Sequence, residues 1–109
     1  MLHNEVMEIW NEIKKFVELN PGTYLTRPIS VRKPTPFMAE NIHGRIRITM
    51  RSGNVSYLKD EDFPGFYNLH LRRERGEKVS KEAGAINQRQ VYFYGLIYWC
   101  HDRKEKPTV

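Results

Sequence analysis

The apolar positions between Asn4 and Asn20 recur every three or four residues, as they do on one face of an amphipathic helix. These apolar residues are Val6, Ile9, Trp10, Ile13, Phe16 and Val17. The motif NPG that follows ends the pattern, because proline cannot continue a helix and glycine readily takes a left-handed turn. The sequence therefore predicts an N-terminal helix that is capped by Asn4 and packs its apolar stripe into the core.

The period changes to two in the stretch RIRITM at residues 45–50, where Ile46, Ile48 and Met50 alternate with polar side chains. Turn-forming residues flank this stretch on both sides, which favours the middle strand of a small antiparallel sheet. Its partners are expected near residues 37–42 and 55–58, after an irregular edge segment in which three prolines remove backbone donors.

Arg45 and Arg47 would share the solvent face of this sheet. They are either solvated polar residues or contacts to phosphate groups, and the alternation does not distinguish the two.

The second half of the chain carries signals for three helices. The acids and proline of KDEDFPGF, residues 59–66, are typical of a helix start, and Gly76 ends this helix. Ser80 can cap a short helix that stops at Gly84, and Asn87 can cap a third that starts at Gln88. Such helices after a hairpin sheet are the parts of a helix-turn-helix module with a β appendage.

The run VYFYGLIYWC, residues 91–100, leaves two alternatives open. The preceding caps favour a helix, whereas the β-branched and aromatic content also suits a buried strand with Gly95 at a bulge or close approach.

Taken together, the elements predict an α+β fold with a single domain at residues 1–102 and a flexible tail at residues 103–109. We expect a cytoplasmic protein without a membrane segment, since no secretory signal pattern opens the chain and its longest uncharged apolar run is about half of a membrane span. The single cysteine, Cys100, is expected to be buried and inert.

The charge of the chain is net +5 and unevenly distributed. Residues 27–51 hold six basic residues and one acid, and residues 71–90 hold six basic residues and three acids. A basic field of this kind favours a polyanion such as nucleic acid, through the release of counterions from phosphates.

The third predicted helix supplies the candidate base-reading residues, Gln88, Arg89 and Gln90, because glutamine can pair with adenine and arginine with guanine. The candidate phosphate contacts are Arg72, Arg73, Arg75, Lys78 and Lys81, together with Arg45 and Arg47. The sequence thus predicts a non-enzymatic DNA-binding module.

The aromatic residues of the run 91–100 predict an alternative. They exceed what one domain is expected to bury, so Tyr92, Phe93, Tyr98 and Trp99 are candidates for an interface. The partner would be a second copy in a homodimer, or a protein or small ligand.

The sequence lacks the motifs of common catalytic sites. Its four histidines are scattered, and Cys100 next to His101 does not have the spacing of a zinc pair. We therefore expect no metal and no cofactor.

The stretch SGNVSYLKDEDFPGFYNLHLRRERGEKVSKEAG, followed by AINQRQVYFYGLIYW, resembles small, largely uncharacterised α+β modules of bacterial mobile-element and defence-associated proteins. Those modules pair a strand hairpin with a capped helix and a helix-turn-helix-like end. The resemblance covers about residues 53–99 and implies biology linked to DNA.

Overall fold

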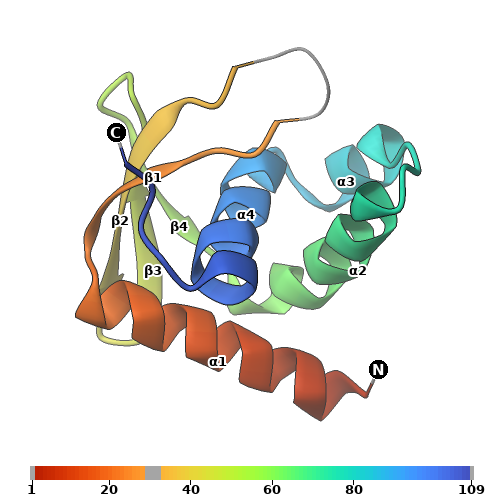
Figure 1. Cartoon of the computed structure of the whole chain (residues 1–109), viewed down its shortest axis with the longest axis horizontal. Coiled ribbons are helices and arrows are strands. Elements are labelled where there is room, and N and C mark those ends of the chain that lie inside the picture. The colour runs from red at the N-terminus through yellow and green to blue at the C-terminus, as the bar shows by residue number, and fades with distance from the viewer. Residues whose placement is uncertain (1, 29–32, 109) are drawn as a thin grey trace.

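The computed structural model describes residues 2–28 and 33–108. In this part of the chain a four-stranded antiparallel sheet, in the order β1-β2-β3-β4, carries helices on one face (Figure 1). The strands are β1 (Gly22–Leu25), β2 (Pro36–Ile42), β3 (Arg45–Thr49) and β4 (Val55–Leu58). The helices are α1 (His3–Leu19), α2 (Phe63–Glu74), α3 (Ser80–Ile86) and α4 (Gln90–Leu96), with the 3₁₀ turn η1 (Asp60–Asp62) before α2 and the π-helix η2 (Ile97–Arg103) continuing α4. The predicted α+β class is confirmed.

Helix α1 buries the predicted stripe through Val6, Trp10, Ile13 and Val17. Its start differs from the prediction, because the helix begins at His3 and Asn4 lies inside the first turn. Leu2 occupies the cap position and makes no side-chain cap bond.

The sheet contains the three predicted strands and one more. The additional strand, β1, pairs with β2 from Gly22 opposite Ala39 to Leu25 opposite Pro36. Pro36 does not break the sheet, because it is the first residue of its strand, where a missing backbone donor is tolerated.

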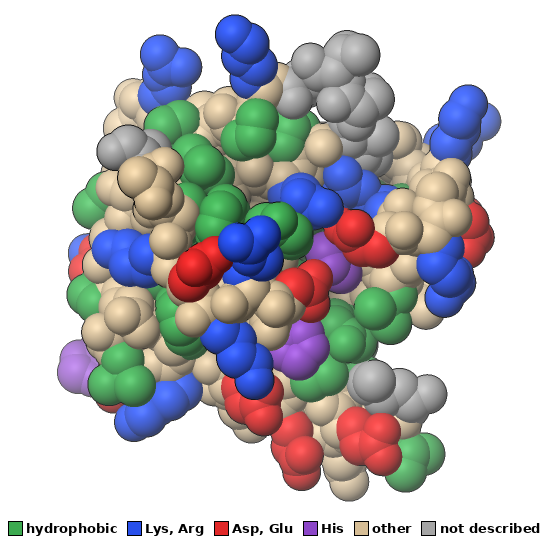
Figure 2. All heavy atoms as spheres, viewed as in Figure 1, with side chains coloured by type: hydrophobic (Ala, Val, Ile, Leu, Met, Phe, Trp, Pro, Cys, Tyr) green, Lys and Arg blue, Asp and Glu red, His purple; other side chains and the backbone are tan. Residues whose placement is uncertain are grey.

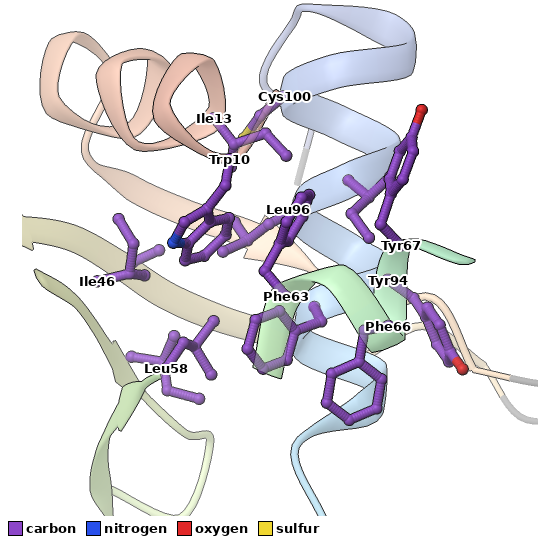
Figure 3. Close-up of a cluster of buried hydrophobic side chains, with 14 of the residues drawn as sticks. Trp10, Ile13, Ile46, Leu58, Phe63, Phe66, Tyr67, Tyr94, Leu96 and Cys100 are labelled. Atoms are coloured by element: carbon purple, nitrogen blue, oxygen red, sulfur yellow. The ribbon is translucent and has the colours of Figure 1, made fainter. Parts of the chain in front are cut away.

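The inner face of the sheet and the helices enclose one aromatic-rich core (Figure 3). Trp10 stacks on Phe63 with ring centroids 4.7 Å apart, and Phe66 stacks on Phe93 at the same distance. The indole Nε1 of Trp10 donates to the Asp60 carboxylate at 2.6 Å, so this acid holds α1 instead of capping α2.

Residues 91–100 are helical, which resolves the two alternatives left open by the sequence. Helix α4 lies in the middle of the molecule, between the sheet and α2 (Figure 1). A Cβ atom at Gly95 would lie 2.5 Å from the carbonyl oxygen of Leu25, so glycine permits the close approach of α4 to β1.

The position of α4 changes the setting of the predicted base-reading residues. The helix starts at Gln90, so Gln88 and Arg89 belong to the preceding turn, and Phe93 to Ile97 are buried. A recognition helix inserts an exposed face into the major groove, and α4 has none beyond its first residues.

The last described residues lie against the domain. Lys104 has the left-handed backbone conformation that ends η2, Lys106 Nζ donates to the carbonyl of Pro21 at 2.9 Å, and Pro107 is buried. The flexibility predicted for residues 103–109 stays a prediction. No helix in the described ranges is long and apolar enough to cross a membrane.

Candidate functional site at the edge of the sheet

A cleft of about 370 Å³ opens between strand β4 and the turn that joins α3 to α4. Its lining is Ser56, Tyr57, Leu58, Lys59, Asp62, Ile86, Asn87, Gln88, Arg89 and Phe93. The cleft thus combines residues of the edge strand, the start of α2 and the polar turn that the sequence marked for base recognition. We call it the β4 cleft.

Strand β4 is an edge strand, and among the described residues it pairs only with β3. The N–H of Met50 donates to the carbonyl of Asn54 at 2.8 Å, which sets the alternation of hydrogen-bonded pairs along the β3–β4 ladder. Tyr57, opposite Arg47, falls on a non-hydrogen-bonded pair. Its backbone N–H and C=O therefore point away from β3, toward the free edge.

The side chain of Asn87 connects two polar residues of the cleft, Asp62 and Arg89. Its side-chain Nδ2 donates to the Asp62 carboxylate, and its Oδ1 accepts from the backbone N–H of Arg89 at 2.6 Å. The bond to Arg89 closes a turn of the Asx type two residues long. The prediction that Asn87 caps the following helix is wrong, because α4 begins at Gln90 with Arg89 at its cap position and no side-chain cap bond. The side chain fixes Asp62 and Arg89 on either side of itself.

Arg89 crosses from this turn to the sheet, where its Nε donates to Ser56 Oγ at 3.1 Å. Its two terminal nitrogens have no hydrogen-bond partner among the described residues. Lys59 is exposed, and no acid within residues 2–28 and 33–108 forms an ion pair with Lys59 or Arg89. Neither of these two cations of the cleft is therefore held in an ion pair, although the lining also includes one acid, Asp62.

Tyr57 joins the cleft to the outer face of the sheet. The guanidinium carbon of Arg45 lies 4.1 Å from the centroid of the Tyr57 ring, a cation–π contact on the face that the helices leave uncovered. Arg47, its neighbour on that face, forms an ion pair with Glu40 instead, and this hydrogen bond raises the pKa of Arg47. Of the two predicted sheet arginines, Arg45 is the one without an acidic partner in the described ranges.

The predicted phosphate contacts on and between α2 and α3 differ in their local partners. Arg72 pairs with Glu77 at 2.9 Å and Glu82 at 3.3 Å, and Arg75 pairs with Glu77 at 3.0 Å. The acids in the same segment therefore offset the charge of both arginines.

Arg73, another of the predicted phosphate contacts, is half-buried. It donates to the carbonyls of Arg27 at 3.1 Å and Pro28 at 3.0 Å, and it covers the ring of Tyr94 at 4.3 Å. Burial lowers its pKa. Lys78 and Lys81, by contrast, are exposed.

The predicted aromatic interface is not a single surface. Phe93 is fully buried between Trp10 and Phe66, so its assignment to an interface is wrong. The other three candidates, Tyr92, Tyr98 and Trp99, are half-buried.

Each of these three has a partner within the chain. Tyr92 meets the ring of Phe37 edge-on at 5.1 Å, Tyr98 lies 3.8 Å below the Arg27 guanidinium, and Trp99 packs edge-on against Tyr98. Most of the aromatic side chains that the sequence predicted to be exposed therefore pack within the chain.

Sequence reasoning placed Gln88 and Arg89 at a binding site and missed Ser56, Lys59 and the role of Asp62 beside them. The position of Asp62 in the sequence is typical of a helix cap, yet its side chain makes no cap bond. No local pattern marks these residues, because only the packing of β4 against the α3–α4 turn brings them together.

Charged side chains of both signs cover the face drawn in Figure 2, with some acidic ones over α1 and some Lys and Arg side chains projecting from the opposite edge. The described residues contain no cluster of three or more His, Cys, Asp or Glu side chains that could hold a metal ion. Burial raises the pKa of Cys100 to about 12.

Comparison of the chain with protein-family models, with curated proteins and with solved structures gave no match. The resemblance of residues 53–99 to mobile-element and defence-associated modules therefore stays a prediction.

Proposed function

We propose that this chain binds single-stranded nucleic acid at the β4 cleft. The observation that carries the proposal is the convergence of Arg89 and Lys59, which form no ion pair in the described ranges, on a concave site. Its lining also holds Gln88, Asn87 and one acid, Asp62. Cations attract phosphates, and side-chain amides can hydrogen-bond to base edges.

A concave site favours a single strand over a duplex. Reading the major groove requires a projecting element such as a helix, and the candidate helix α4 is buried. Unpaired bases can instead turn into a cleft and bond there through their exposed edges. Duplex DNA, which the sequence alone favoured, is thus the less suitable partner for this geometry.

Tyr57 adds a stacking surface next to the cleft. Tyr57 as a residue is 36% exposed and Arg45 lies over its ring, so one base can pack against this pair on the outer face while the next enters the cleft. Stacking on an aromatic ring contributes about 1–3 kcal/mol per base in single-strand binding proteins.

The outer face of the sheet also favours a second candidate function, protein interaction. Met38 and Val55 are 48% and 56% exposed on the same face as Tyr57, and exposed apolar side chains are typical of contact surfaces. A partner protein on this face would bind with weak salt dependence, in contrast to nucleic acid.

The homodimer expected from the sequence is a proposal about assembly. Two copies would present two clefts to one strand and would steepen the salt dependence of binding. The molar mass in solution, measured by light scattering with and without oligonucleotide, tests it.

The proposed function is tested by fluorescence anisotropy with a labelled single strand of about 12 nucleotides and a hairpin duplex of the same composition. We expect the single strand to bind more tightly, with log affinity falling by about 0.7 per phosphate contact for each unit of log salt concentration. Absence of binding at low salt, or a preference for the duplex, would overturn the proposal.

A further inference from the structure

The lining of the β4 cleft holds both an acceptor and a donor group, the Asp62 carboxylate and the Arg89 guanidinium. Asn87 bonds to the Asp62 carboxylate with one end of its amide and to the backbone N–H of Arg89 with the other, so it ties the segments that carry the two groups together. The guanidinium itself is held by its bond to Ser56 on the sheet side of the cleft.

We propose that the β4 cleft selects guanine, with Asp62 accepting hydrogen bonds from N1–H and N2–H₂ and Arg89 donating to O6 and N7. The inference rests on the proposed binding of single-stranded nucleic acid and names the base that this site prefers. Guanine presents two donors and two acceptors on adjacent stretches of its edge, which is the order that the two side chains require.

Both side chains have hydrogen-bonding capacity left for a ligand. A carboxylate accepts about four hydrogen bonds, and Asn87 uses one of those of Asp62. Arg89 commits its Nε to Ser56, which leaves its two terminal nitrogens as a pair of donors. The bond to Ser56 also fixes the direction in which that pair points.

The same carboxylate disfavours the other bases and the phosphate group. The N1 of adenine and the two carbonyls of thymine or uracil place lone pairs where guanine has donors, and cytosine lacks an N7 for the arginine. A phosphate inside the cleft would meet the like charge of Asp62, so it lies outside, near the exposed Lys59.

The remaining lining suits a flat aromatic ring. Ile86, which is half-buried, supplies apolar surface to the cleft and can contact the face of a base while the base edge meets the polar groups. Leu58 and Phe93 also belong to the lining but are buried. The preference thus comes from the base edge, and stacking adds affinity for any base.

The test uses an oligothymidylate of about 12 nucleotides in which the central base is replaced. Guanine at this position should raise the affinity of the unchanged protein about tenfold over thymine, as one good bidentate contact does. Hypoxanthine, which lacks the N2 amino group, and 7-deazaguanine, which lacks N7, should each lose most of this gain. The comparison involves no variant, so it does not depend on any substitution being tolerated.

Asp62→Asn is the matching variant, because it keeps the shape of the side chain and replaces one acceptor by a donor. It should bring the guanine-to-thymine affinity ratio close to one. Glu61→Gln is the control, since Glu61 is exposed on the same turn and does not line the cleft; it should leave the ratio unchanged. Thermal unfolding of each protein verifies its fold.

The outcomes separate this inference from the proposed function. Salt-dependent binding of all these oligonucleotides with equal affinity would overturn the guanine preference and leave single-strand binding standing. A ratio that persists in Asp62→Asn would equally overturn the role of the carboxylate. No binding of any oligonucleotide would overturn both proposals.

Discussion

Arg89 donates a hydrogen bond from Nε to Ser56 Oγ at 3.1 Å and so ties the turn before α4 to the edge strand β4. The two residues are 33 positions apart in the chain, and their contact forms one side of the β4 cleft. The bond holds an otherwise mobile cationic side chain in one direction. Such preorganisation reduces the conformational entropy that binding a ligand would cost.

Ser56→Ala should weaken single-strand binding several-fold, because the Arg89 side chain then has to be ordered by the ligand. The free energy of unfolding should fall by only about 0.5–1.5 kcal/mol, the net contribution of one hydrogen bond. Anisotropy titrations and urea denaturation measure the two effects. Thr49→Ala is the control, since Thr49 lies on the neighbouring strand and outside the cleft; an equal loss of affinity in both variants would argue against preorganisation of Arg89.

Substitution of single cations should distinguish binding at the β4 cleft from binding at the predicted phosphate contacts of α2. Lys59→Ala should lower the affinity for a single strand and reduce the salt slope, because an unpaired charge near a phosphate is lost. Arg72→Ala should leave both nearly unchanged, since Glu77 and Glu82 already offset its charge. Titrations at several salt concentrations measure both quantities. A larger effect of Arg72→Ala would place the interface on α2 and α3, as the sequence predicted.

Gly95→Ala should destabilise the fold by about 1–3 kcal/mol, because its Cβ would lie 2.5 Å from the Leu25 carbonyl oxygen and force α4 away from β1. Gly84→Ala is the matched control in α3, where a new Cβ meets no atom within 4 Å. That variant should stabilise the protein by about 0.5–1 kcal/mol through its better helix propensity. Urea denaturation measures the free energy of unfolding of both variants. A similar change in the two would contradict the close approach of α4 to β1.

The ion pair of Glu74 with Arg27 should contribute to stability at neutral pH and lose its contribution in acid. The hydrogen bond from Arg27 holds the pKa of Glu74 below its usual value of 4.5. A depressed folded-state pKa means that the contribution is present above the unfolded-state pKa and is lost as the pH falls through the folded-state pKa. Arg27→Gln should therefore be less stable than the unchanged protein at pH 7, and this difference should shrink below about pH 4.

Urea denaturation of the two proteins across this range measures the difference. Its size should be small because both side chains are partly exposed. A difference that does not change with pH would show that Arg27 acts through its contact with Tyr98 instead.

Cys100 should resist thiol reagents while the protein is folded. Its burial raises the pKa of the thiol to about 12, so at pH 8 the reactive thiolate is scarce as well as shielded. The labelling rate at pH 8 should therefore follow unfolding and rise steeply with urea near the midpoint. Rapid labelling of the folded protein at a rate independent of urea would contradict the burial of this residue.

Several elements follow from short stretches of sequence. Helix α1, the strands β2, β3 and β4 and the helix starts before α2 and α3 depend on periodicity and turn residues that are close together in the chain. Strand β1 was missed because its four residues, the first of which is the glycine of NPG, are too few to display a period, and the strand is ordered by pairing with β2.

The candidate site was predictable only in part. Asn87 and Arg89 stand out as a polar turn after a helix, and this local feature survives in the structure. The fate of Arg73 was not predictable, because the carbonyls that bind it belong to Arg27 and Pro28, more than forty positions earlier in the chain.

The sequence by itself determined the α+β class, the apolar stripe of α1 and the alternation of the central strand, because each depends on side chains within a few residues of one another. Only the tertiary structure decided that α4 is the central buried helix and that the polar turn before it faces β4. That placement depends on which apolar faces pack together, since Phe93 must be buried between Trp10 and Phe66, far away in the sequence. The packing places the predicted base-reading residues Gln88 and Arg89 in the wall of a cleft.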